Sequence, residues 1–193
     1  MADVERTRQR ILGAAYACVA RSGLARTSLD SAAKEAGLSR ATVYRYFPGG
    51  RDQLVDEVIT WEVGRFFARL AAAIDDAPDF TTRLERGLVA AHEALEHHEV
   101  LQQVLQTEAD QLLPPLATTM PIVHAVMRDD FAERLADERL RPGVDVVDAA
   151  DYLARMVLSL IGTQGRWNLE DRDAVRRLVR EQLLAGILES PAG

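Results

Sequence analysis

The chain is short of the residues and patterns that mark secreted proteins, membrane proteins and redox sensors. Its 193 residues include a single cysteine, Cys18, so no intramolecular disulfide can form. Cys18 lies beside Val19 on the inner face of an expected first helix, which favours a packed thiol over a redox sensor. No apolar run reaches the roughly 18 residues of a membrane-spanning helix, and residues 1–10 are too charged for a signal peptide. We therefore expect a cytoplasmic protein with no membrane partner.

Patterns typical of catalysis are missing as well. The sequence has no glycine-rich phosphate loop, no Gly-x-Ser-x-Gly turn and no nucleophile with a placed base. His97 and His98 lie among three glutamates, but Glu-x-x-His spacing is absent and no second cluster completes a metal site. We expect no catalytic residue, no metal and no cofactor. A helical-bundle enzyme remains an alternative, although no motif supports it.

Residues 27–54 carry the spacing of a helix-turn-helix. Gly37 lies between two short amphipathic segments, where a sharp bend needs a residue that accepts positive φ. Ala33, four residues earlier, is small enough to let two helices cross closely. The apolar faces that would lock the two helices together are supplied by Leu29, Ala36, Leu38 and Val43.

Both expected helices have start signals. Thr27 and Asp30 have the spacing of a capping box for the first helix, and Ser39 is placed to cap the second, which should cover residues 40–46. With its apolar side turned inward, the second helix leaves polar side chains to project outward. These side chains are Arg40, Thr42, Tyr44 and Arg45.

The outward side chains have the chemistry of a DNA reader. Arginine can make a bidentate contact to guanine, threonine can touch a base edge or a thymine methyl, and tyrosine hydroxyls bind phosphate oxygens. The same residues on an isolated short helix would more simply form a solvated face. The helix-turn-helix spacing around them favours DNA.

Charge is distributed unevenly along the chain. Residues 1–51 hold nine basic and four acidic side chains, a net charge of +5, whereas the whole chain has a net charge of −7. The remaining 142 residues therefore carry −12. A basic end on an acidic body confines polyanion binding to that end.

Residues 7–54 resemble the DNA-binding domain of the tetracycline-repressor-like (TetR) family of bacterial transcriptional regulators. That family has an amphipathic first helix ending in an aromatic and a glycine, a threonine-capped second helix, and then Ala-Gly-Val-Ser-x-Gly-Thr-Leu-Tyr-x-His-Phe before a Lys-x-x-Leu entry to helix four. This chain has Ile11-Leu12-Gly13-Ala14-Ala15-Tyr16, then Gly23 and Thr27, and then Ala36-Gly37-Leu38-Ser39-Arg40-Ala41-Thr42-Val43-Tyr44-Arg45-Tyr46-Phe47.

The chain departs from the family pattern at three places. Ala32 replaces the usual isoleucine, Tyr46 replaces the usual histidine, and the link Pro48-Gly49-Gly50-Arg51 is one residue longer than usual. The resemblance implies base contacts from Arg40 and Arg45, with the other side chains on the backbone or groove. The expected DNA-binding set is Thr27, Ser39, Arg40, Thr42, Tyr44, Arg45, Tyr46 and Arg51, the last reaching a phosphate at the start of a helix.

The expected fold is all-α, because strand signals are absent and helical periodicity recurs along the chain. We expect a three-helix DNA-binding domain over 1–51 and a larger helical bundle over 52–193, which binds an effector and ends in a dimerisation hairpin. Prolines between Pro114 and Pro121 predict a break, and a turn is expected at 141–143. After the head, the expected helices cover about 52–75, 80–98, 100–110, 122–137, 145–167 and 171–188.

The last two expected helices carry apolar stripes that suit a four-helix bundle between two copies of the chain. Alternatively, these stripes complete the chain's own core. The resemblance implies a homodimer, for which the expected interface residues are Leu153, Val157, Ile161, Val175, Val179 and Leu183.

A small-molecule effector is likewise implied by the resemblance. Polar or soft side chains on otherwise apolar segments could line its pocket, although each one singly also suits ordinary packing. These candidates are Trp61, Phe67, His92, Gln103, His124, Met127 and Met156. We expect a homodimeric repressor that a small, largely hydrophobic effector releases from a palindromic double-stranded operator. A constitutive DNA-binding regulator that answers to no ligand is the alternative.

Overall fold

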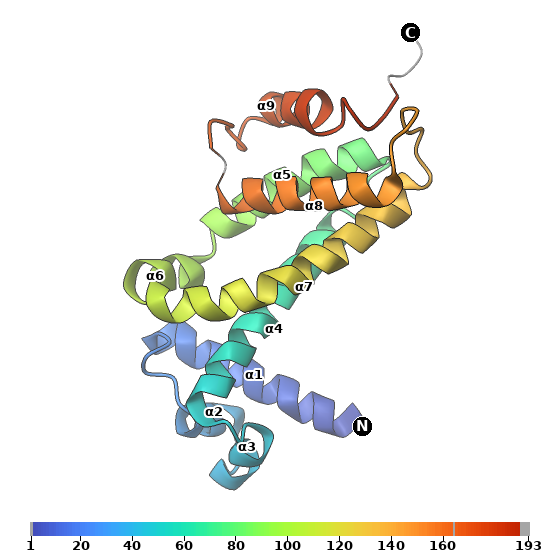
Figure 1. Ribbon diagram of the computed structural model, residues 1–193. Coiled ribbons are helices and arrows are strands. Elements are labelled where there is room, and N and C mark those ends of the chain that lie inside the picture. The colour runs from blue at the N-terminus through green and yellow to red at the C-terminus, as the bar shows by residue number, and fades with distance from the viewer. Residues whose placement is uncertain (1, 164, 190–193) are drawn as a thin grey trace. The chain divides into compact units, whose positions relative to one another are not determined.

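The described part of the chain, residues 2–163 and 165–189 of a computed structural model, is all-α (Figure 1). The described residues form no β-strand, and an isolated bridge joins Leu140 and Leu188. The chain divides into two compact units. The first unit comprises residues up to Phe66 together with His98–Thr119, and the second comprises Phe67–His97 and the residues from Met120 onward. No described helix is long and apolar enough to cross a membrane.

The first unit gathers the N-terminal helices around one buried core. It contains α1 (Ala2–Ser22), α2 (Leu29–Ala36), α3 (Arg40–Tyr46) and α6 (Glu99–Thr107). The initial parts of α4 (Gly50–Ala73) and α7 (Ala109–Leu135) complete it. Its core includes Ile11, Leu24, Val43, Phe47 and Leu54, all fully or almost fully buried.

Local capping confirms the turn between α2 and α3. Gly37 has a φ of +61°, the left-handed conformation that ends α2, and Leu38 N donates to Ala33 O at 3.0 Å. Ser39 caps α3, because its Oγ accepts from Thr42 N at 3.1 Å. The Arg40–Tyr46 helix therefore has the expected bounds.

The cap of α2 differs from the expectation. Ser28, and not Thr27, is the N-cap, and its reciprocal partner is Ser31 at the third helical position. The Thr27 hydroxyl instead donates to Gly23 O at 2.9 Å, inside the preceding loop. Threonine and serine are both suited to an N-cap, so residue type could not distinguish Thr27 from Ser28. The spacing between Thr27 and Asp30 led to the wrong prediction.

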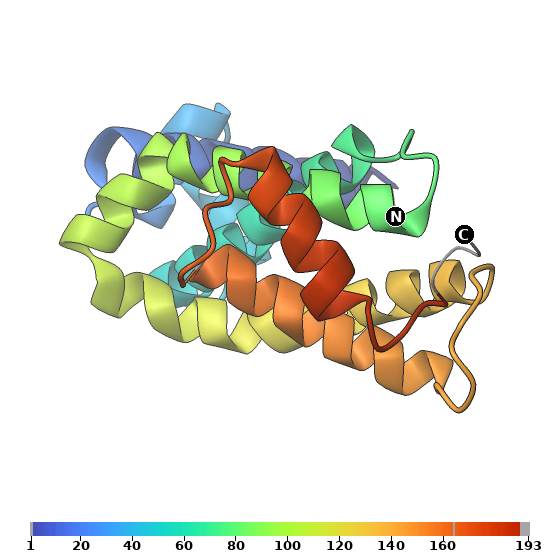
Figure 2. The same cartoon turned by 90° about the horizontal axis from the view of Figure 1, so that it is seen from above.

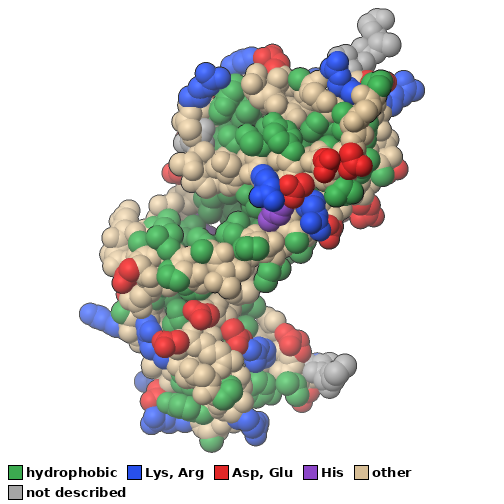
Figure 3. Space-filling model, viewed as in Figure 1, with side chains coloured by type: hydrophobic (Ala, Val, Ile, Leu, Met, Phe, Trp, Pro, Cys, Tyr) green, Lys and Arg blue, Asp and Glu red, His purple; other side chains and the backbone are tan. Residues whose placement is uncertain are grey.

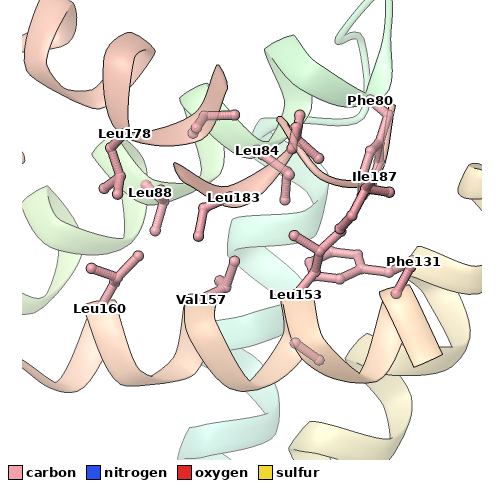
Figure 4. Close-up of a cluster of buried hydrophobic side chains, with 14 of the residues drawn as sticks. Phe80, Leu84, Leu88, Phe131, Leu153, Val157, Leu160, Leu178, Leu183 and Ile187 are labelled. Atoms are coloured by element: carbon pink, nitrogen blue, oxygen red, sulfur yellow. The ribbon is translucent and has the colours of Figure 1, made fainter. Parts of the chain in front are cut away.

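The second unit packs α5 (Phe80–Glu96), α8 (Val146–Gly162) and α9 (Arg172–Arg177) around a separate core (Figure 2). Helix α9 continues into a π-helical segment, η1 (Leu178–Leu183). Figure 4 shows this core, in which Leu88 of α5 and Leu153 of α8 point toward Leu178 and Leu183 of η1. Partly buried side chains, Trp167 among them, pack against its edge.

The break predicted at the prolines was wrong, because α7 continues through Pro114, Pro115 and Pro121. A proline deprives the carbonyl four residues earlier of its helical donor. The residues affected here, Asp110, Gln111 and Ala117, are exposed or half-buried, so water can bind their carbonyls. Thr118 and Thr119 also donate to Pro114 O and Pro115 O, which stabilises the prolines' own turns.

The remaining predicted bounds are close at the helix starts and too long at several ends. The predicted starts at residues 145 and 171 coincide with Asp145 and Asp171, the N-caps of α8 and α9. Helix α8 ends at Gly162 instead of residue 167, and η1 ends at Leu183 instead of residue 188. The expected turn at 141–143 is present, with Gly143 at a φ of +85°.

Candidate nucleic-acid interface

Helix α3 is anchored on one side and presents the other to solvent. Val43 and the following Phe47 are fully buried in the core of the first unit. Arg40, Tyr44 and Arg45 therefore project outward, and Tyr44 is 48% exposed. Lysine and arginine side chains gather at the end of the first unit that carries α2 and α3 (Figure 3). The anchored helix can thus insert polar and cationic side chains into a groove.

The two arginines of α3 have different surroundings. The Nε of Arg40 lies 2.6 Å from Asp30 Oδ1 on α2, although 70% of the arginine side chain is exposed. Arg45 lies over the ring of Tyr46, 5.7 Å from its centroid, and makes no ion pair with the described residues. Arg40 must share its guanidinium with Asp30, whereas Arg45 is available to a phosphate or a base.

Hydroxyl groups surround the start of α3. Ser39 Oγ and Thr42 Oγ1 lie 2.8 Å apart, and both residues are at least partly accessible. The Ser39 hydroxyl oxygen already accepts a hydrogen bond from the backbone, and its proton can be donated to a phosphate oxygen. Tyr46 is half-buried against the core, with less of its ring accessible than that of Tyr44.

The structure removes Thr27 from the expected set of DNA contacts. Its side chain is fully buried, and its hydroxyl is satisfied by Gly23 O. A hydroxyl in that position cannot reach a phosphate without unfolding the loop. Thr27 therefore stabilises the loop before α2 and is not a contact residue.

Arg51 is also engaged inside the protein. Its Nε donates to Thr27 O at 3.2 Å, and one terminal nitrogen donates to Leu24 O and to Gln111 Oε1, both at 2.9 Å. The other terminal nitrogen lies 3.5 Å from Asp52 Oδ1. The expected phosphate contact is replaced by a set of internal contacts, because the guanidinium is held against the loop.

One important side chain escaped the sequence analysis. Glu108, the residue between α6 and α7, accepts from Leu24 N at 2.5 Å and from Ala25 N at 3.1 Å. The contact joins residues more than 80 positions apart, so no local spacing signals it. A glutamate at a break between two helices was the only available sign.

Several basic residues of the N-terminal end add to the charge of this surface, but Arg8 does not. Arg8 pairs with Glu57, donates to Tyr46 O and lies 4.9 Å from the Phe47 ring centroid. Besides Arg45, the exposed cations of residues 2–51 without an ion pair or hydrogen bond to the described residues are Arg6, Arg10, Arg26 and Lys34. Arg10 lies over the turn, since its Nη2 is 3.2 Å from the position a Cβ on Gly37 would take.

The predicted effector residues are distributed over both units. Trp61 and Gln103 belong to the first unit. The indole of Trp61 donates to Gln9 and stacks edge-on with Tyr16, while Gln103 is exposed. Phe67 is half-buried in the part of α4 that belongs to the second unit.

The other four candidates lie in the second unit. Met127 and Met156 pack against the core of Figure 4. The Nε2 of His92 lies 4.0 Å from Glu170 Oε1, and that of His124 lies 3.4 Å from Asp151 Oδ1. Only the two methionines are thus brought against one cluster, and a pocket formed by the set remains a prediction. Among the described residues, no group of three His, Cys, Asp or Glu side chains is placed to hold a metal ion.

The residues expected at the dimer interface are largely used by the chain itself. Ile161 is half-buried, and the other five are buried in the core of the second unit. These five are Leu153, Val157, Val175, Val179 and Leu183. A side chain that is buried within one chain cannot line a surface between two chains. These five residues therefore fit the alternative interpretation, in which the stripes complete the chain's own core.

A family model for the DNA-binding domain of "bacterial regulatory proteins, tetR family" matches residues 11–58. The match covers the helix-turn-helix described above, with α3 inside it. Residues 11–58 thus resemble a TetR-family DNA-binding domain. This match agrees with the expected helix-turn-helix and with a transcriptional regulator as its function class.

Full-length relatives and solved structures agree with the TetR-family fold. The HTH-type transcriptional repressor KstR2 of Mycobacterium tuberculosis is 26% identical over 191 residues, covering 96% of this chain and 93% of the relative. KstR2 of Mycolicibacterium smegmatis is 27% identical over 186 residues, with coverages of 94% and 88%. A putative TetR-family regulator from Mesorhizobium loti has a TM-score of 0.63 at 20% identity, with coverages of 96% and 98%. The SmeT–triclosan complex has a TM-score of 0.57 at 24% identity, with coverages of 95% and 92%.

Proposed function

We propose that this TetR-family protein is a repressor that binds a palindromic operator as a homodimer and is released by a small, largely hydrophobic effector. The observation that carries the DNA-binding part is the anchoring of α3 through Val43, which leaves Arg40, Tyr44 and Arg45 exposed on one short helix. Arg40 and Arg45 read base edges, while Thr42, Tyr44, Tyr46 and the Ser39 hydroxyl contact the backbone. Repression is supported by the KstR2 relatives, which are named as repressors.

The homodimer is supported by the short reach of one recognition helix, which covers only a few base pairs. Because the apolar stripes of α8 and α9 are used internally, the partner surface needs other side chains. The second unit exposes four large apolar side chains for this purpose, which are Ile122 and Val126 on α7 and Val147 and Tyr152 on α8. Two copies of such a surface can associate about a twofold axis.

The hydrophobic effector is supported by two observations. The second unit is rich in apolar side chains with soft, partly buried methionines at the edge of its core. SmeT, a protein of the same fold, is described in complex with triclosan. Residues around Met127 and Met156 are the proposed lining, to which His92 and His124, each close to a carboxylate, would add polar groups.

Selection of DNA duplexes from a random-sequence library by the purified protein tests DNA recognition. We expect an enriched palindrome whose half-site centres are separated by about one helical turn, roughly 34 Å, or a multiple. Light scattering of the free protein should give twice the mass of the chain. Enrichment of a single unpaired half-site together with a monomeric mass would contradict the dimer.

A constitutive regulator without a ligand is the second candidate. It is supported by the finding that only two of the predicted effector residues, Met127 and Met156, pack against one cluster. Thermal unfolding against panels of small hydrophobic compounds separates the two. A ligand that binds the folded state raises the unfolding midpoint, because it adds a stabilisation that grows with the logarithm of its concentration relative to its Kd. A protein without an effector gives no such shift with any compound.

A further inference from the structure

The loop between α1 and α2, residues 23–27, is hydrogen-bonded by side chains that do not belong to the helix-turn-helix. Glu108 holds two of its amide groups, Leu24 N at 2.5 Å and Ala25 N at 3.1 Å. Arg51 of α4 holds two of its carbonyl groups, Leu24 O at 2.9 Å and Thr27 O at 3.2 Å. An anion thus faces the donors of the loop and a cation faces its acceptors.

The two charged residues are tied to the same helix. Arg51 also donates to Gln111 Oε1 at 2.9 Å, and Gln111 lies in the first turn of α7, three residues after Glu108. All of these residues belong to the first unit. The loop, the start of α4 and the start of α7 are therefore joined by one connected set of charge-assisted hydrogen bonds. We call the three residues that hold the loop, Glu108, Arg51 and Gln111, the loop clamp.

The fit between the clamp and the loop is close at Gly23. Gly23 has a φ of +83°, and a Cβ built there would lie 2.8 Å from Glu108 Oε2. Thr27, at the other end of the loop, is fully buried and bonded back to Gly23 O. The next residue, Ser28, is the N-cap of α2. The clamp consequently fixes the backbone up to the residue from which α2 begins.

We infer that Glu108 and Arg51 are positioning residues for operator recognition. They set where α2 begins, and the tight turn at Gly37 transmits that placement to α3. Hydrogen bonds with one ionised partner are roughly twice as strong as neutral ones, so this placement is well defined. The inference rests on the proposed function, in which α3 enters the groove, and it adds residues from outside the helix-turn-helix that do not touch DNA.

The salt dependence of binding distinguishes positioning from a phosphate contact. Each lost phosphate contact lowers the slope of log affinity against log salt by about 0.9. A variant that loses only the placement of α3 binds more weakly at every salt concentration and keeps the wild-type slope. By this measure Arg51→Ala should resemble Glu108→Ala and differ from Arg10→Ala, which removes an exposed cation near the turn at Gly37.

The probe is a fluorescein-labelled duplex selected by the wild-type protein from a random library. We expect Glu108→Ala to weaken binding about tenfold, as for loss of a charge-assisted hydrogen bond, with an unchanged salt slope. Glu108→Gln keeps an oxygen acceptor and should recover part of the affinity. Asp110→Asn is the matched control, because Asp110 is exposed in the same turn and has no hydrogen bond to the described residues. Its affinity should stay within about twofold of wild type.

Hydrogen exchange provides a readout that does not depend on DNA. The Leu24 and Ala25 amides should exchange faster in Glu108→Ala, and those of α8 should not change. Wild-type affinity in a variant with accelerated loop exchange would overturn the inference, as would a slope reduced by about one in Arg51→Ala. If Glu108→Ala does not fold, Glu108→Gln carries the same comparison. Failure of the wild-type protein to select any duplex would instead overturn the proposed function itself.

Discussion

Arg40 and Tyr44 are neighbours on the exposed side of α3, yet they should contribute to recognition in different ways. We expect Arg40→Ala to relax the preference at one operator position by about 1–3 kcal/mol, because the bidentate guanidinium is lost. Tyr44→Phe removes one phosphate donor and should weaken all sequences equally. Competition binding with single-base variants of the selected duplex measures both effects. Unchanged affinity and preference in Arg40→Ala would remove Arg40 from the reading residues.

The pairing of Arg40 with Asp30 provides an internal check on this prediction. The 2.6 Å contact holds the arginine toward α2, although both side chains are largely exposed. Exposed ion pairs contribute little to stability, about 0–1 kcal/mol. Asp30→Asn should therefore leave the fold intact while freeing the guanidinium, so its effect on DNA affinity reports how Asp30 orients Arg40.

Arg10 and Arg8 lie two residues apart in α1 and form a natural pair of variants. Arg10 is exposed over the turn, whereas Arg8 is bound to Glu57 and the backbone of α3. We expect Arg10→Ala to lower the salt slope of DNA binding by about 0.9 if it contacts one phosphate. Arg8→Ala should lower the unfolding midpoint and keep the slope. Fluorescence anisotropy titrations over a range of salt concentrations measure the slope, and identical slopes for wild type and Arg10→Ala would exclude that contact.

Individual helices show where local sequence information was sufficient. The bounds of α3 were predicted correctly because Gly37, Ser39 and the inward Val43 lie within seven positions of one another. The starts predicted for α8 and α9 fall at Asp145 and Asp171, which cap these helices. These features depend on neighbours in the sequence, which spacing can reveal.

Other features depend on contacts between distant positions and were missed. The break predicted at Pro114 is absent, and the residues of α7 whose carbonyls lose a donor to the prolines are exposed or half-buried, where water can bind. Periodicity identified the apolar faces of α8 and α9 but could not tell whether they cover the chain's own core or a partner. Likewise, a basic residue at the start of α4 suggested a phosphate contact, and only the fold shows Arg51 bound to the loop.

Within the second unit, Asp151 of α8 gives a pH-dependent contribution to stability. The hydrogen bond from Arg155 lowers the pKa of Asp151, and the nearby charges of His124 and Arg128 act in the same direction. Because the folded pKa lies below the unfolded one, the stabilisation is present above the unfolded pKa and is lost as pH falls through the folded value.

We therefore expect Asp151→Asn to flatten the acid side of the stability profile. Thermal unfolding between neutral pH and about pH 3 should show a smaller loss for the variant than for wild type below about pH 4. Asp137→Asn is a suitable control, because Asp137 is exposed in the turn after α7 and has no side-chain partner among the described residues. Parallel profiles for wild type and Asp151→Asn would contradict the assigned contribution.

The complete protein should couple its two ligands if an effector controls it. Helices α4 and α7 each contribute residues to both units, so either helix can respond to changes in both. A coupling free energy of about 1–3 kcal/mol is typical, and it must be reciprocal. We expect saturating operator to weaken effector binding by the same factor by which the effector weakens operator binding. Titration calorimetry with and without the selected duplex measures this factor, and equal effector affinities would favour the constitutive alternative.

The two tryptophans are divided between the units, one in each. Trp61 packs with Tyr16 in the first unit, and Trp167 packs against the core of the second. Each indole therefore senses the solvent exposure of its own surroundings through its emission wavelength. In Trp61→Phe the red shift on adding denaturant would follow the second unit alone, and in Trp167→Phe it would follow the DNA-binding unit alone. The natural sequence thus already contains a separate optical reporter for each half of the molecule.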